Sequence, residues 1–131
     1  MTPQQVTAAL EAQLLALFPA TPIAWPGTEF EPTGGTAWMR AVNRSGQAFA
    51  AEMGTQALSR RTGAYVVQCF APDGGGSGEA RDMAAGVEAG FRRDGIGGVE
   101  CGEAYTEDLG SDGRGWYQCN VIVPWWAWIG E

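Results

Sequence analysis

The sequence predicts an α+β domain in which a mainly antiparallel (mixed) sheet of about five or six strands carries two helices on one face. Two amphipathic stretches with helical periodicity, one at the N-terminus and one in the second half, predict the helices. Stretches of alternating apolar and polar residues, separated by glycine-rich turns, predict the strands. The length of 131 residues suits one domain over 1–131, with no linker or internal repeat.

The first helix is predicted over residues 4–18, where apolar side chains recur at helical spacing: Val6, Leu10, Leu14, Leu17 and Phe18. Thr2 is a plausible N-cap, and Pro3 suits the first helical position. Pro19 and Pro22 end the helix. Residues 23–32 contain two prolines and a glycine, which predicts an extended segment rather than a central strand.

In the first half of the chain, strands are predicted over 37–43 and 47–53, and residues 56–70 are predicted to form one long strand or a bent pair of strands. Arg44, Ser45 and Gly46 predict a turn between the first two, and Gly54 marks a turn or bulge. In the second strand one face is predicted to hold Gln47, Phe49, Ala51 and Met53.

The second helix is predicted over about 78–93, after a flexible loop at 71–78. Its apolar face would contain Ala80, Met83, Ala84, Val87 and Phe91. Ser77 is the expected N-cap, Arg92 and Arg93 fall in the last turn, and Gly95 suits the C′ position.

The C-terminal third predicts a strand over 98–105, a hairpin loop over 106–115 and a last strand over 116–124 that Pro124 ends. The last strand alternates, so that one face would contain Tyr117, Cys119, Val121 and Val123.

Composition excludes several function classes. Fifteen acidic residues face eight basic ones, all arginines, for a formal net charge of -7. A negative surface repels phosphate backbones, which argues against adhesive nucleic-acid binding. There is no histidine, so Ser-His-Asp and Cys-His nucleophilic systems and the commonest zinc ligand are missing. We therefore expect that the protein is not an enzyme and that it has no catalytic, metal or cofactor site.

The cysteines and the N-terminus indicate a cytoplasmic setting. Cys69 and Cys119 lie in apolar strand patterns, and with Cys101 they make an odd count, which favours buried thiols in a reducing compartment over a disulfide framework. The N-terminus lacks the basic segment of a signal peptide, and no apolar run approaches the ~20 residues of a spanning helix. We expect no membrane association.

Three apparent motifs fail in detail. Gly74, Gly75, Gly76 and Gly78 precede a helix but lack the Lys-Ser/Thr ending of a phosphate loop, so a mobile loop is favoured. Asp108 to Asp112 matches only part of a calcium loop, which favours a solvated hairpin loop. The carboxylate pairs Glu29/Glu31 and Glu107/Asp108 lie in polar segments and are expected to be ionised and exposed.

Six tryptophans are many for this length, and three of them, Trp125, Trp126 and Trp128, cluster near the C-terminus. This cluster either caps the protein's own core, which is favoured, or contacts a partner, or stacks on a sugar. Exposing all three would invite aggregation, and aromatic anchors dominate interface energies.

The order of the segments resembles phage tail terminator (tail completion) proteins of lambda-like long-tailed phages. An amphipathic helix is followed by IAWPGTEFEP, then AWMRAV, then a strand of the form R-x-G-x-x-x-V-Q-x-F from Arg61 to Phe70. A Gly-rich loop and helix, APDGGGSGEARDMAAGVEAGF, and a final strand, GWYQCNVIVPW, complete the set.

The resemblance implies a structural virion protein that forms a homohexameric ring at the head-proximal end of the tail tube. Such a ring ends tube polymerisation and joins the tail to the head connector (neck) protein, after assembly in the host cytoplasm. Its partners would be further copies of the chain, the major tail tube protein and the connector. Genomic double-stranded DNA would pass through the lumen without specific binding.

We expect assembly contacts in the strands over 37–62, in the two loops at 71–78 and 106–115, and in the tryptophan-rich tail. The candidate interface residues are Arg40, Phe49, Arg60, Arg61, Trp125, Trp126 and Trp128. Alternative functions are a small carbohydrate- or ligand-binding module that uses the tryptophans, another phage neck or minor tail protein, or a small carboxylate hydrolase.

Overall fold

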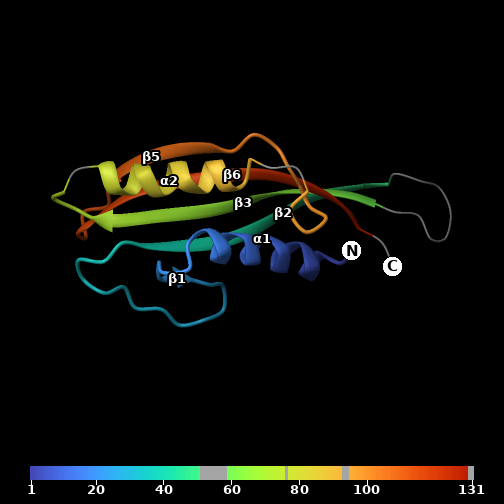
Figure 1. The fold of residues 1–131 in the computed structure, drawn as a ribbon. Coiled ribbons are helices and arrows are strands. Elements are labelled where there is room, and N and C mark those ends of the chain that lie inside the picture. The colour runs from blue at the N-terminus through green and yellow to red at the C-terminus, as the bar shows by residue number, and fades with distance from the viewer. Residues whose placement is uncertain (51–58, 76, 93–94, 130–131) are drawn as a thin grey trace.

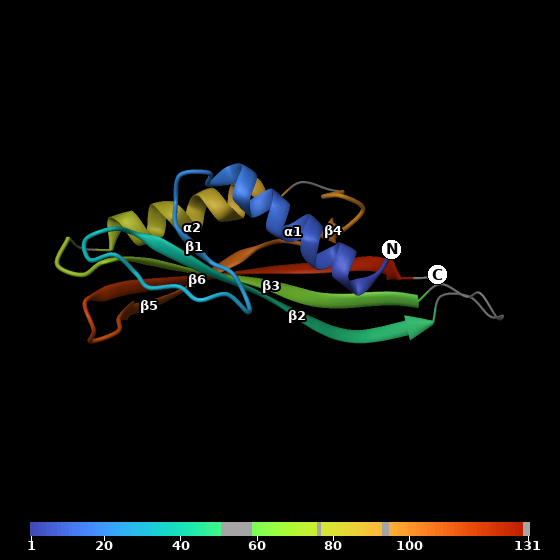
Figure 2. The ribbon, with the colours of Figure 1, turned by 90° about the horizontal axis from the view of Figure 1, so that it is seen from below.

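The computed structural model describes residues 1–50, 59–75, 77–92 and 95–129, with residues 47–50 described by their backbone alone. Two helices pack on one face of a mixed sheet of six strands (Figures 1 and 2), which confirms the predicted α+β class. In chain order the elements are α1 (Pro3–Leu17), β1 (Ile23–Ala24), β2 (Trp38–Ala50), β3 (Ser59–Pro72), α2 (Gly78–Gly90), β4 (Glu100–Cys101), β5 (Tyr105–Ser111) and β6 (Trp116–Ile129).

The sheet is built around the long strands β2, β3 and β6. The spatial order is β1-β2-β3-β6-β4, and β5 pairs with β6 on the same side as β4. β1 is parallel to β2, and every other pairing is antiparallel. β2 and β5 therefore run along opposite sides of the sheet.

The first helix forms as the sequence predicts. The Thr2 hydroxyl accepts a hydrogen bond from the Gln5 backbone N–H at 3.2 Å, and the Thr2 N–H donates to Gln5 Oε1 at 2.8 Å, which is a complete capping box. Pro3 occupies the first turn. Val6, Leu10 and Leu14 are fully buried against the sheet.

The second helix has the predicted apolar face but ends earlier than predicted. Ala80, Ala84 and Val87 are buried, and Phe91 at the C-cap is fully buried in the core. Because the helix ends there, no basic residue lies in its last turn, and Gly95, with φ 73°, belongs to the following loop rather than to C′. Ser77 is the N-cap residue, but its side chain makes no capping hydrogen bond.

Two glycines of α2 bring the helices together. A Cβ on Gly86 would lie 3.0 Å from Phe18 Cζ, and one on Gly90 would lie 2.2 Å from a Leu17 methyl carbon. Gln13 Nε2 donates to the Gly90 carbonyl at 2.9 Å across the same contact. The missing side chains at these positions let the end of α1 approach α2 closely.

The predicted turn at 44–46 is wrong, because β2 continues through it. Its residues pair with β3 from Trp38 to Ser45, and the pairing resumes at Ala48 after a β-bulge. The bulge absorbs one extra residue without reversing the chain. The expected face of Gln47, Phe49, Ala51 and Met53 lies outside the described side chains. β2 and β3 thus form a long pair that extends beyond the helices (Figure 1).

The predicted loop at 106–115 is also wrong over most of its length. Residues Tyr105–Ser111 form β5 against β6, with a bulge between Asp108 and Gly110, where Gly110 has φ 79°. The actual turn is short, and the Asp112 Oδ1 accepts hydrogen bonds from the Arg114 and Trp116 N–H groups at 2.7 and 3.2 Å. Within the strand predicted over 98–105, Glu100–Cys101 form β4 and Tyr105 begins β5.

The prediction that Pro124 ends the last strand is wrong, because Pro124 lies inside that strand. β6 runs to Ile129 and pairs with β3 throughout. The Pro124 carbonyl accepts from the Gly102 N–H at 2.8 Å, on the side away from β3. In an extended strand a residue's N–H and C=O point the same way, so the N–H that proline lacks falls between β5 and β4, outside the ladder with β3.

The main core lies between the helices and the sheet. It includes the predicted alternate residues of β6 and both strand cysteines, Cys69 and Cys119, which are fully buried and face each other across β3 and β6. A smaller cluster lies on the opposite face, where Trp38 stacks on Phe70 with ring centroids 4.2 Å apart and Phe30 covers Trp38.

Tyr65 is the largest fully buried side chain of the main core, and its hydroxyl has no hydrogen-bond partner within the described part of the chain. Burial, with a smaller contribution from Glu11, raises the pKa of this phenol. Because a buried donor without a partner destabilises the fold, we expect Tyr65→Phe to leave the free energy of unfolding unchanged or raise it by about 1 kcal/mol. Urea denaturation measures this, and a loss above ~1 kcal/mol would show that the hydroxyl has a partner.

Candidate assembly surface

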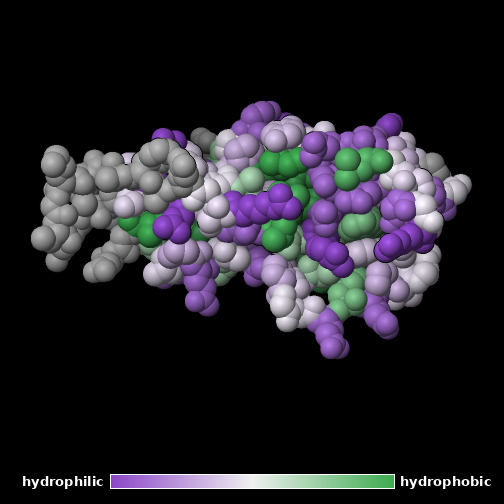
Figure 3. Space-filling model, turned by 180° about the vertical axis from the view of Figure 1, so that it is seen from behind, coloured by the Kyte–Doolittle hydropathy of each residue, from purple (hydrophilic) through white to green (hydrophobic). Residues whose placement is uncertain are grey.

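One face of the sheet is not covered by the helices. Along it, Val42, Val66 and Ile122 are Cα partners across β2, β3 and β6. Viewed from behind, this side of the molecule shows a hydrophobic area in its middle, bordered by hydrophilic side chains (Figure 3). We call the side chains of β2, β3, β5 and β6 that point away from the helices the uncovered face.

Three of the seven candidate interface residues meet on this face. The Arg60 guanidinium lies over the Trp126 ring, 4.8 Å from its centroid. Trp126 and Trp128 contact edge to face with centroids 5.8 Å apart, and Trp128 is 44% exposed. Arg60 and Trp128 are also direct cross-strand partners. This is a cation–π and aromatic cluster with an accessible tryptophan at its edge.

Trp125 points the other way, because side chains alternate along β6. It is 2% exposed in the main core, and its indole N–H donates to Asn43 Oδ1 at 2.8 Å. Asn43 Nδ2 donates in turn to the Thr7 hydroxyl of α1 at 2.9 Å. Trp125 therefore caps the protein's own core, whereas Trp128 remains accessible.

The other three candidates are dispersed. Arg40 is exposed, with its guanidinium carbon 5.4 Å from the Trp38 ring centroid. Arg61 is half-buried, and its Nε makes no hydrogen bond within the described residues. The Phe49 backbone pairs with Arg60, and its side chain lies outside the described part.

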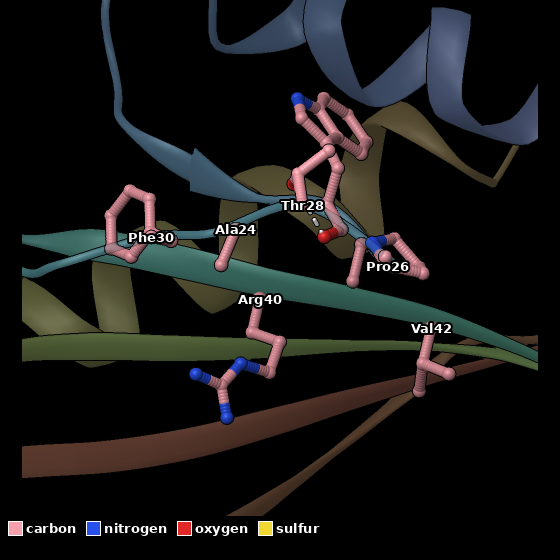
Figure 4. A pocket seen from close by; sticks show the side chains of 9 residues that line it. Ala24, Pro26, Thr28, Phe30, Arg40 and Val42 are labelled. Atoms are coloured by element: carbon pink, nitrogen blue, oxygen red, sulfur yellow. Dashed lines mark hydrogen bonds between the residues drawn. The ribbon is translucent and has the colours of Figure 1, made fainter.

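A pocket of about 310 Å³ opens where β1 leaves the edge of β2. Its walls are the end of β1, the segment that follows it and three residues of β2: Ala24, Trp25, Pro26, Gly27, Thr28, Phe30, Arg40, Ala41 and Val42. In Figure 4 the side chains of Arg40 and Val42 lie on the same side of β2. No local sequence pattern indicates this pocket, because it depends on where a two-residue strand ends.

The acidic motifs have structural roles. Asp108 forms an ion pair with Arg81 Nη2 at 2.5 Å and accepts a hydrogen bond from the Tyr117 hydroxyl at 2.6 Å. These two partners, Tyr117 first, lower the pKa of Asp108, and the contact links α2 to the β5–β6 hairpin. Asp73 accepts from the Ser111 hydroxyl and the Gly74 N–H. The described residues contain no cluster of three or more side chains arranged to bind a metal.

No helix in the described ranges has the length and apolarity needed to cross a bilayer. Among solved structures, nine chains match. One of them, which has no descriptive name, is 21% identical, with a TM-score of 0.70 over 96% of this chain and 95% of its own. At that identity it shows the fold alone. No curated protein matches.

A family model described as phage tail terminator protein matches residues 5–125. The match extends from the first turn of α1 to Trp125 in β6, so it includes most of α1, all of α2 and the whole sheet apart from the end of β6. The chain therefore belongs to the phage tail terminator protein family, whose members are structural components of the virion tail.

Proposed function

We propose that the protein forms a ring on the head-proximal end of the tail tube, where it ends tube polymerisation and provides the surface that docks to the head connector. The observation that carries the proposal is the family match over residues 5–125. Further copies of the chain, the tube protein and the connector are the partners of this role.

The surface of the molecule suits a role in assembly. The Arg60–Trp126–Trp128 cluster combines the side-chain types that anchor protein interfaces, and Trp128 is accessible on it. The net charge of -7 suits a ring through which DNA passes without being held. The copies in the ring would contact each other head to tail, since a cyclic arrangement of more than two copies requires two different surfaces per subunit.

Tube growth tests the proposal. Purified tube protein is allowed to polymerise with and without this protein, and tube lengths are measured by negative-stain electron microscopy. We expect shorter tubes whose ends no longer accept tube protein when this chain is present. Tubes of equal length, and equal growth after fresh tube protein is added, would contradict it. Trp128→Asp should weaken capping if the aromatic cluster contacts a partner. Leu15→Asp on α1 is the matched control and should leave capping unchanged.

A further inference from the structure

We propose that neighbouring subunits join by pairing β5 of one copy with β2 of the next, so that the sheet continues from subunit to subunit. The inference rests on the proposed ring and specifies the surface that closes it. Both strands are edges of the described sheet: β5 pairs with β6 alone, and β2 pairs beyond Arg40 with β3 alone. Exposed edges of this kind are templates for strand addition.

Strand direction favours the pairing. β2 and β6 run one way, and β3 and β5 run the other. A rotation that carries one copy onto the next and continues the sheet places β5 of one copy antiparallel to β2 of its neighbour. Antiparallel pairing is the more favourable arrangement, and a closed ring of such contacts covers the open edges of both β2 and β5.

The regular parts of the two edges are similar in length and select a register. β2 is open and unbulged over residues 41–45, and β5 is unbulged over 105–108. Antiparallel pairing of these parts, with the uncovered faces aligned, places Tyr105 opposite Arg44 and Glu107 opposite Val42. If β5 were shifted along β2 by two residues in one direction, it would meet the part of β2 that pairs with β1. In the other direction it would meet the bulge of β2.

Charge and apolar groups are complementary in this register. Glu107 would lie diagonally between Arg40 and Arg44, at a separation that long side chains span. All three are exposed, and in the described part of a single chain the ion pair that forms is Arg81–Asp108 instead. The acidic residues Glu100, Glu103 and Glu107 lie along the β4–β5 side, whereas the β2 edge carries Arg40 and Arg44.

The exposed apolar residues of β5 have a place in the same contact. Tyr105 and Leu109 are each 53% exposed, so both large side chains are accessible to a partner on this edge. Tyr105 would lie over the Arg44 guanidinium, a favourable cation–π arrangement. Leu109 would reach the mouth of the pocket between Phe30, Arg40 and Val42 of the next copy, where the walls are largely apolar.

Disulfide trapping tests the register. The paired variant Arg44→Cys/Tyr105→Cys is made in a Cys101→Ser background, since Cys69 and Cys119 are buried. Opposed positions on paired strands lie close enough for a disulfide. Mild oxidation of the protein mixed with tail tubes should produce a ladder of linked subunits on a non-reducing gel. Val42→Cys/Glu107→Cys provides a second opposed pair, and Leu15→Cys/Tyr105→Cys, which joins opposite faces, is the control without a ladder.

The outcomes separate the two proposals. Capped tubes with a ladder from either opposed pair, and none from the control, support both. Capped tubes with no ladder from either opposed pair overturn the strand pairing and leave the proposed function standing. Tubes that are never capped, even by the unmodified chain, overturn the proposed function and the pairing with it.

A charge exchange provides an independent readout. Glu107→Arg alone should lower the amount of protein bound to tube ends at least tenfold, because three arginines would then lie together. Adding Arg44→Glu should restore most of it. Equal binding by Glu107→Arg and the unmodified chain would count against the contact.

Discussion

Gly63→Ala is expected to lower the free energy of unfolding by roughly 3 kcal/mol, at the upper end of the range for overpacked cores. A Cβ at this position would lie 2.5 Å from Trp125 Cζ2 and 2.6 Å from the Arg44 carbonyl oxygen. Neither neighbour can move easily. The Arg44 oxygen belongs to the backbone of β2, and the Trp125 ring is buried and bound to Asn43.

Urea denaturation followed by tryptophan fluorescence measures this effect. Gly34→Ala is the matched control, because a Cβ there meets no atom within 4 Å and its φ is not positive. The control should change stability by less than about 0.5 kcal/mol. Equal stability of the two variants would mean that β3 and β6 can separate around Gly63 at little cost.

Trp125→Ala should be the most damaging of the tryptophan substitutions, with a loss of about 3–5 kcal/mol. It removes a large side chain from the main core, and it also leaves the Asn43 carbonyl oxygen without its donor. Trp125→Phe keeps much of the apolar volume and loses the hydrogen bond, so its loss should be intermediate and separates the two contributions.

Trp128→Ala is the comparison for this prediction. Trp128 lies on the uncovered face, 44% exposed, and its contact is with the edge of Trp126. We expect it to change stability by less than about 1 kcal/mol and to act on assembly instead. If Trp128→Ala destabilised the monomer as much as Trp125→Ala, the division between a core tryptophan and a surface tryptophan would be wrong.

Local signals predicted the helices well. In α1 the cap, the first-turn proline and the apolar spacing all fall within a few residues of one another, so a single window contains the whole argument. The strands were harder, because pairing with distant residues decided their limits. The turn residues at 44–46 and the polar segment at 106–111 both became strand, since β3 and β6 supplied partners along their length.

For the candidate surface, too, local signals identified residue types, whereas the contacts depended on strand pairing. Trp126, Trp128 and Arg60 could be selected from residue type, but their contact depends on register between β3 and β6. Tyr105 is predicted at the end of a strand and Glu107 in a solvated loop, and nothing local distinguishes them from ordinary surface residues. Their position on an edge strand follows from the strand order alone.

The position of the protein on the tail tests the central claim most directly. Tails assembled with a version of the chain that carries a small affinity label are isolated and imaged by electron microscopy with a gold-conjugated probe. We predict gold at one end of each tail, the end that binds heads, and a closed ring in averaged end-on views. Label distributed along the tube, or confined to the end far from the head, would contradict it.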